Sequence, residues 1–312
     1  MQHMAKGKNL FFKTALIFLP IYIIFLLDDF YNFSDHGVYE IINTRNEYIK
    51  QSENINSIII GGSNALWGIS AEQLNNLSNN KFYNLSMHSN GVNYENYFEY
   101  ILQSVDPIQA KNINLIIWSS VHVFFDPPYN DFDRDIAGRL RQSKLIPNQS
   151  LLSKIYKTLV NQESVHFEVS PSSGDFLFSN FKCPLSDERY LSNDLINRIS
   201  KQSFNFAPLG PLDAQIQTYK FFFKRYFPNA KIVYVVPSVL NPPEILSNEL
   251  KFLYNNFDEE NFSVLIQQPI QDVKYLCESA HHPNAEGRKI RTSEIYEFLK
   301  TNKFLELTNI HM

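Results

Sequence analysis

The sequence predicts an α/β protein built on a doubly wound, mostly parallel sheet, with an inserted cap and one N-terminal transmembrane helix. Short apolar runs alternate along the chain with amphipathic stretches, which is the pattern of strands joined by crossover helices. A long polar stretch separates the third of these runs from the fourth, and an apolar segment lies near the N-terminus. Hydrophobic residues make up 44% of the 312 and charged residues 19%, so the chain can bury one large core.

The apolar segment runs from Leu10 to Leu27 and has the composition of a membrane anchor. Its eighteen residues, at about 1.5 Å each in a helix, reach about 27 Å, which is enough for a bilayer core. Lys6 and Lys8 precede it, and positive charge on this short side places the N-terminus in the cytosol. Asp28 and Asp29 follow it in place of small residues, which favours an uncleaved anchor over a cleavable signal peptide.

This anchor divides the chain and predicts a single-pass protein of the cell membrane whose main domain lies outside the cytosol, in a periplasm or on the outer face. The expected parts are a cytosolic tail over 1–9, the transmembrane anchor over 10–27, a stalk over 28–54 and an α/β domain over 55–305. Within the stalk, Val38 to Ile49 is expected to form a short helix.

Two cysteines, Cys183 and Cys277, would lie in the oxidising compartment outside the cytosol. There they either form a disulfide or remain two buried thiols, and the sequence leaves both open.

Five short runs are predicted to be strands because each is mostly apolar or aromatic and short. In chain order they are Ser57–Ile60, Phe82–Leu85, Leu115–Trp118, Lys231–Val236 and Phe262–Ile266. Helices are predicted from a capping box over residues 70–73, from apolar residues three and four apart over 94–102, and from the stretches 213–227 and 285–299.

The stretch from about Asp126 to Asn205 is too long for one ordinary crossover and is rich in Asp, Asn, Ser and Pro. It contains a helix-like piece, Leu151 to Val160. We interpret this insertion as a cap that covers the mouth of a site at the sheet edge.

Active groups of a doubly wound sheet gather at the carboxyl ends of its strands, and two such turns contain suitable residues. After the first strand the chain reads Gly61-Gly62-Ser63-Asn64, in which two glycines permit a sharp turn ahead of a serine. After the last strand, His281 and His282 stand just before the final helix. A histidine can take the proton that makes serine a nucleophile, so the two turns together predict a serine-histidine site.

These motifs, in this order, resemble the SGNH/GDSL hydrolase superfamily over about residues 55 to 300. They are Gly61-Gly62-Ser63-Asn64, then Asn84-Leu85-Ser86 through Asn90-Gly91, and finally His282-Pro283-Asn284 with Gly287. The anchor and Trp67-Gly68-Ile69 after the serine turn are most similar to the membrane-anchored cell-surface polymer modifiers, which include accessory proteins of teichoic-acid D-alanylation and alginate acetylation. The resemblance implies a three-layer fold.

The resemblance makes Ser63 the nucleophile and His282 the base. It makes the Ser63 backbone N–H and Gly91 the oxyanion donors, with the neighbouring Asn64 and Asn90 as further candidates.

The sequence departs from the family pattern at two places. The family's acid stands three residues before the histidine, where this chain has Ser279, while Glu278 is one position further away. Either Glu278 orients His282 after a small shift, or the site works as a dyad, or His281 is the base and Glu278 has the family spacing. The family's Gly-x-Asn turn after the third strand is also missing, because residues 118–122 read Trp-Ser-Ser-Val-His.

Two functions follow. The first is serine-dependent acyl transfer, by an O-acyltransferase or an esterase, on an extracytoplasmic glycan or cell-envelope polymer, with a membrane-bound acyl-donor protein as a further partner. The second is a catalytically idle member that assists a membrane partner in envelope assembly. No cofactor or metal is expected, since the histidines lack ligand spacing. A net charge of −4 without a long basic run argues against nucleic-acid binding.

Overall fold

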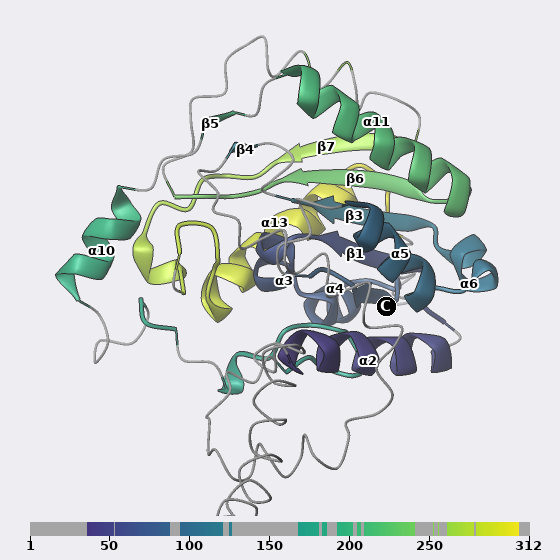
Figure 1. Ribbon diagram of the computed structural model, residues 1–312, viewed down its shortest axis with the longest axis horizontal. Helices are drawn as coiled ribbons and strands as arrows, with labels where there is room; N and C mark the ends of the chain where they lie inside the picture. Colours follow the sequence, from purple (N-terminus) through teal and green to yellow (C-terminus); the bar gives the residue numbers. More distant parts are fainter. Residues whose placement is uncertain are drawn as a thin grey trace, which may run out of the picture.

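Five parallel strands form the central sheet of the protein (Figure 1). Their order is β2 (Phe82–Asn84), β1 (Ser57–Gly61), β3 (Leu115–Ser119), β6 (Lys231–Val236) and β7 (Phe262–Ile266). All five predicted strands are confirmed, β6 and β7 at their predicted bounds. The chain starts on β1, moves out to β2 and then returns past β1 to β3, so the sheet is doubly wound and its strand ends meet at one edge.

The computed structural model describes residues 36–52, 54–87, 94–120, 125–126, 168–180, 183–185, 192–201, 205–206, 209–240, 252, 255, 261–277 and 279–305. The predicted anchor, most of the predicted cap with its piece Leu151–Val160, and the site candidates Asn90, Gly91 and Glu278 lie outside these ranges. Within them, no helix is both long and apolar enough to cross a membrane.

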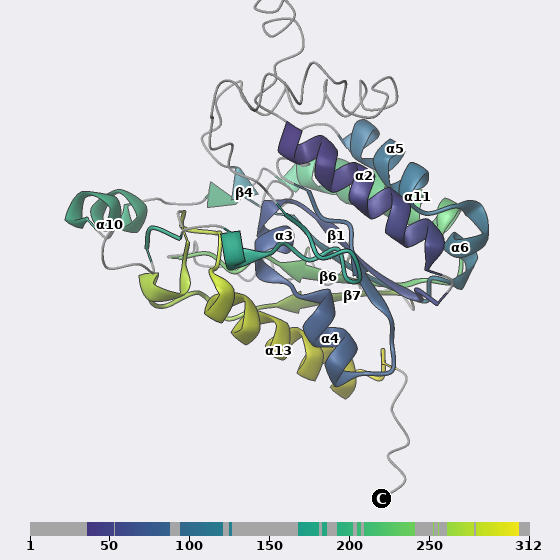
Figure 2. The same ribbon diagram turned by 90° about the horizontal axis from the view of Figure 1, so that it is seen from below.

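Helices cover both faces of the sheet (Figure 2). One face carries α2 (His36–Gln51), α5 (Tyr94–Ser104), α6 (Pro107–Asn112) and α11 (Leu209–Tyr226), and the other carries α3 (Ser63–Gly68), α4 (Ala71–Leu77) and α13 (Ala285–Thr301). A separate helix, α10 (Asn193–Ser200), and two short 3-10 turns, η3 (Phe178–Asn180) and η4 (Val273–Tyr275), belong to the connections.

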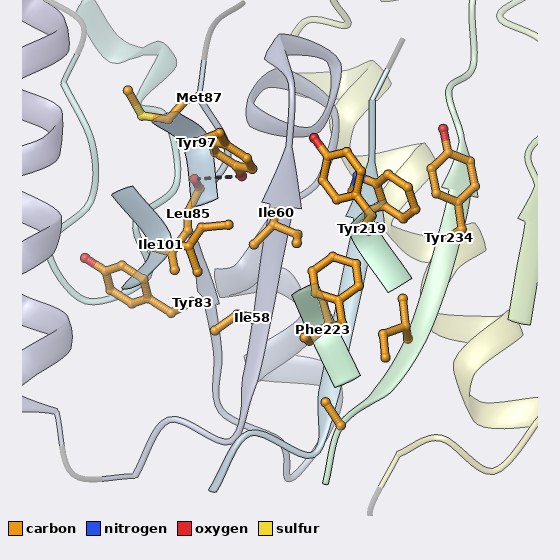
Figure 3. Packing of buried hydrophobic residues seen from close by; sticks show 14 of the residues in the cluster. Ile58, Ile60, Tyr83, Leu85, Met87, Tyr97, Ile101, Tyr219, Phe223 and Tyr234 are labelled. Carbon is orange, nitrogen blue, oxygen red and sulfur yellow. Dashed lines mark hydrogen bonds between the residues drawn. The ribbon is translucent and has the colours of Figure 1, made fainter. Parts of the chain in front are cut away.

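Among the described residues, two apolar cores on opposite faces of the sheet explain the three layers, because successive strand residues point to opposite faces. In β1, Ile58 and Ile60 join the core under α5 and α11, whereas Ile59 joins the core under α4 and α13. Figure 3 shows the first of these cores, in which Tyr219 and Phe223 of α11 pack against the sheet. The alternation of side chains along each strand therefore divides the apolar residues between the two faces of the sheet.

The first described helix, α2, belongs to the packed body. Arg45 is fully buried and donates from Nη1 to the Ser86 carbonyl and from Nη2 to the Gly174 carbonyl, both at 2.6 Å. Ile49, one turn later, is buried in the core. The packed body therefore begins before residue 55, within the segment that we expected to be a stalk.

The ends of the predicted cap come together. Strand β4 (Phe125–Asp126) pairs antiparallel with β5 (Asn205–Phe206), and Asp126 is the register partner of Asn205. Another part of the insertion, within residues 168–180, packs against the sheet and its helices. Asn84 N–H of β2 donates to the Ser173 carbonyl at 2.8 Å. Asp175 accepts from the Ala71 and Glu72 N–H groups at the start of α4, at 2.8 Å each. This part of the insertion supports β2 and α4.

Candidate active site

The turn after β1 has a conformation that requires glycine. Gly61 has φ +145°, and a Cβ at this position would overlap the Ser119 carbonyl oxygen of the neighbouring strand β3. Gly62 N–H donates to the same Ser119 oxygen at 3.0 Å, and Met87 N–H donates to the Gly61 carbonyl at 3.0 Å. The turn is thus hydrogen-bonded to β3 on one side and to the segment after β2 on the other. Ser63 follows it as the first residue of α3.

Asn64 is directed at the end of β3. Its Nδ2 donates to Ser119 Oγ at 2.8 Å, and both residues are fully buried. Ser119 occupies the place where the family pattern has its Gly-x-Asn turn. The side chain that follows the candidate nucleophile is therefore fixed to the sheet edge, while its role as an oxyanion donor stays a prediction.

The segment that carries the histidines is folded back on itself. Cys277 N–H donates to the His282 carbonyl at 2.8 Å, and Leu276 forms a β-bridge with Pro283. Asn284 then caps α13, because its Oδ1 accepts from Gly287 N–H at 3.0 Å.

A disulfide fixes this segment to the end of the insertion. Cys183 and Cys277 are bonded, and Leu185 N–H donates to the Cys277 carbonyl at 2.9 Å. Of the two possibilities that the sequence left open, the structure shows the disulfide.

Trp67 joins the two turns. It lies one helical turn after Ser63 in α3, and its indole stacks on the His282 imidazole, with 5.2 Å between ring centroids and 4° between planes. Phe176 and Phe178 from the insertion contact the same indole. The structure therefore places His282 beside the helix that Ser63 opens.

The two histidines are in different positions. His282 is buried and stacks on Trp67, while the half-buried His281 lies against His282 with 4.2 Å between ring centroids. A hydrogen bond from Ser63 to either imidazole stays a prediction, and so does the role of Glu278, which lies outside the described residues. Ser279, the alternative at the family's acid position, is partly buried.

Two buried tyrosines lie near the same sheet edge. Tyr97 Oη accepts from Gly61 N–H at 2.7 Å, and Tyr234 Oη donates to the Ser120 carbonyl at 3.0 Å. Burial raises the pKa of both hydroxyls well above the ordinary tyrosine value. Both groups therefore remain neutral around neutral pH.

A buried arginine lies under α3. Arg291 of α13 donates from Nε and Nη2 to Gln267 Oε1 at 3.0 and 2.7 Å, and a Cβ at Gly68 would overlap its guanidinium. Burial lowers the pKa of Arg291 to about 10. Gly68 is thus needed for the close approach of α3 to α13.

Three residues of this region were not predicted as site residues. Ser119 and Tyr97 contact the serine turn only through the tertiary fold, so no local spacing marks them. Trp67 carries a weak signal, because a residue four positions after Ser63 shares its helix face. Within the described part of the chain, no three His, Cys, Asp or Glu side chains gather as a metal site would need.

The arrangement joins a serine at a strand-end turn to a buried histidine through one helix. Such a pair can carry out nucleophilic catalysis, in which the imidazole accepts the serine proton.

Comparison with known proteins assigns the chain to no family. No family model matches the chain, and no curated protein matches it. Similar solved structures include an acetyl xylan esterase, Est2A, from the rumen bacterium Butyrivibrio proteoclasticus, with a TM-score of 0.40 and 9% identity over 81% of this chain and 65% of that one.

Two further structures are similar at the same level. One is a putative platelet activating factor from Streptococcus pneumonia, with a TM-score of 0.43 and 11% identity over 89% of this chain and 99% of that one. The other is an active-site mutant of a family two carbohydrate esterase from Clostridium thermocellum, with a TM-score of 0.35 and 11% identity over 80% of this chain. The chain spans 65% of the length of each of the two carbohydrate-active enzymes. Because these TM-scores and identities are low, we base the function on this chain's own site.

Proposed function

We propose that the protein is a serine-dependent acyl-transfer enzyme of the SGNH type, an esterase or O-acyltransferase that acts on an extracytoplasmic glycan or another cell-envelope polymer. The stacking of Trp67 on His282 is the observation that carries the proposal. It brings the last turn of the sheet against the helix that Ser63 opens, although most of the chain separates the two residues.

In this proposal His282 takes the proton of Ser63 Oγ as the oxygen attacks the carbonyl carbon of an ester. The tetrahedral intermediate collapses, the alcohol leaves with the proton from the imidazole, and the acyl group stays on Ser63. A water molecule or a sugar hydroxyl then attacks the acyl-enzyme, with His282 again accepting the proton. The bond from the acyl carbon to Ser63 Oγ breaks, the imidazole returns the proton to Oγ, and the acid or the new ester leaves. The Ser63 backbone N–H and Gly91 are the proposed oxyanion donors.

The third member of the site is proposed with its alternatives. Glu278 orients His282, or the site works as a Ser63–His282 dyad with Ser279 at the family's acid position. A site in which His281 is the base is less well supported, because His282 is the imidazole that contacts Trp67.

The disulfide supports the proposed location. A bond between Cys183 and Cys277 persists in oxidising compartments and is rare in the cytosol. It therefore agrees with a domain held outside the cytosol by an anchor over residues 10–27, where envelope polymers and a membrane-bound acyl donor would meet it.

One observation favours the second function, a catalytically idle accessory protein. The segment 118–122 lacks the asparagine of the family's Gly-x-Asn turn, and the hydroxyl of Ser119 in this segment accepts from Asn64 at 2.8 Å. Such a protein would keep the fold and bind a membrane partner without turning over esters.

Ester hydrolysis by the detergent-solubilised full chain separates the two functions. We expect release of p-nitrophenol from p-nitrophenyl acetate and of acetate from an O-acetylated polysaccharide, with loss of both in Ser63→Ala. Added sugar acceptor that diverts the acyl group from water would identify a transferase. Wild-type protein that is folded and inactive on every ester and acceptor would favour the accessory role.

A further inference from the structure

We propose that Tyr97 is a positioning residue for Ser63, because its hydroxyl replaces one bond of the sheet ladder directly ahead of the serine turn. The inference rests on the proposed function and adds to it a residue that the family resemblance does not supply. Tyr97 acts through the backbone of Gly61 and needs no contact with substrate.

The ladder between β1 and the segment after β2 is regular on either side of this rung. Leu85 N–H donates to the Ile59 carbonyl at 2.7 Å, and Met87 N–H donates to the Gly61 carbonyl at 3.0 Å. In a parallel ladder with this register, the Leu85 carbonyl would accept directly from Gly61 N–H. That direct bond is the one that the tyrosine replaces.

The hydroxyl of Tyr97 lies between the two backbone groups and bonds to both of them. Gly61 N–H donates to Tyr97 Oη at 2.7 Å. Oη in turn donates to the Leu85 carbonyl at 3.3 Å, the bond that is dashed in Figure 3. The tyrosine comes from α5, and its side chain is fully buried. An oxygen atom inserted in the rung separates β1 from the neighbouring segment at the last residue of the strand.

This separation acts on the serine turn. Gly61 is the residue whose φ of +145° starts the turn, and Ser63 follows two positions later. A change in the position of the Gly61 peptide therefore moves Ser63 relative to His282, which is held by a different part of the chain. Displacement of a reacting group by about 1 Å can cost on the order of a hundredfold in rate.

Replacement of Tyr97 by phenylalanine has two structural outcomes: the first displaces the turn, and the second removes the hydrogen bonds that hold it in place. Either the rung closes into a direct bond from Gly61 N–H to the Leu85 carbonyl, or the two groups stay apart as buried, unpaired polar groups. Because burial raises the pKa of Tyr97, the hydroxyl stays protonated and its loss should not change the shape of the pH–rate profile.

The test compares Tyr97→Phe with Tyr100→Phe in the full chain, with p-nitrophenyl acetate as substrate. Tyr100 is a matched control because it lies in the same helix, is also buried, and its hydroxyl has no hydrogen-bond partner among the described residues. We expect Tyr97→Phe to lower kcat by about 10- to 100-fold, with KM within about threefold, an unchanged pH profile and cooperative thermal unfolding. Tyr100→Phe should match the wild type.

Other results would overturn the inference. They are an unchanged kcat in Tyr97→Phe, an equal loss in both variants, a rise in KM that accounts for the whole loss, or loss of folding in Tyr97→Phe alone, which would make the hydroxyl a stability element. Ser63→Ala is assayed in parallel. If wild-type activity does not depend on Ser63, the proposed function and this inference fall together, whereas Ser63-dependent activity with Tyr97→Phe equal to Tyr100→Phe removes the inference alone.

Discussion

The two halves of the candidate site are held in place by different means. The turn that carries Ser63 continues the sheet: Gly62 N–H donates to Ser119 of β3, and the Gly61 carbonyl accepts from Met87 beside β2. The segment that carries His282 lies beyond the last strand and depends on the Cys183–Cys277 disulfide and on stacking against Trp67. The proposed nucleophile is therefore positioned by the sheet itself, and the proposed base is positioned by a disulfide and a ring stack outside the sheet.

This difference predicts that mutations in the two halves have different effects on folding and on activity. Changes to the glycine backbone of the serine turn should affect the sheet and hence the folding of the whole domain, whereas changes at the histidine segment should leave the sheet intact and affect activity. The following predictions run from the largest expected effect to the smallest.

Gly61→Ala should have the largest effect on stability. The new Cβ would overlap the Ser119 carbonyl, and φ of +145° is unfavourable for alanine, so we expect a loss of more than about 3 kcal/mol in the free energy of unfolding. Urea denaturation followed by circular dichroism measures it. A variant as stable as the wild type would contradict the claim that the turn after β1 requires glycine at position 61.

Removal of the disulfide should have the next largest effect. The double variant Cys183→Ser with Cys277→Ser should lose about 2 to 3 kcal/mol, and its ester hydrolysis should fall because the His282 segment loses its link to the insertion. Dithiothreitol should reproduce both losses in the wild type and change nothing in the double variant. Full activity after reduction would show that the stack on Trp67 is sufficient.

Trp67→Phe should affect activity more than stability. The smaller ring leaves a gap beside His282 and should cost about 2 kcal/mol of stability, together with a drop in kcat. Trp118→Phe is the matched control, because Trp118 is equally buried but stacks on Tyr219 in the core under α5 and α11. A similar drop in kcat in both variants would argue against a specific role for the stack.

Ser119→Ala should have the smallest effect. It removes the acceptor of Asn64 Nδ2 in a fully buried place, which should cost about 1 kcal/mol. Ser120→Ala is the control, since the Ser120 hydroxyl is buried without a hydrogen-bond partner among the described residues. Thermal unfolding of the two variants measures the difference, and equal midpoints would show that the Asn64 bond contributes nothing.

The sequence predicted the strands better than the way in which the helices pack around them. Runs such as Ile232–Val236 within β6 are apolar without interruption and end at turn residues, so local pattern is enough to find them. The role of Arg45 in attaching α2 was not predicted, because a single charged residue in a polar stretch gives no sign that it is buried.

For the candidate site, too, the sequence indicated some residues and gave no sign of others. Ser63 and His282 stand in recognisable motifs, and the structure brings their segments together through Trp67. Tyr97 was visible only as one apolar position of an amphipathic helix, because its partners Gly61 and Leu85 are chosen by the register of β1 against its neighbour. Contacts set by tertiary packing leave no local spacing to detect.

Covalent labelling tests the central claim, that Ser63 and His282 act as one unit, most directly. The detergent-solubilised full chain is treated with a fluorophosphonate, which captures serine nucleophiles, and intact mass and peptide mapping follow the adduct. We expect one adduct on Ser63 in the wild type, none in Ser63→Ala, and labelling slowed by about a thousandfold in His282→Ala, because an unassisted serine is a poor nucleophile. Absence of an adduct in folded wild-type protein, or labelling of His282→Ala at the wild-type rate, would contradict the claim.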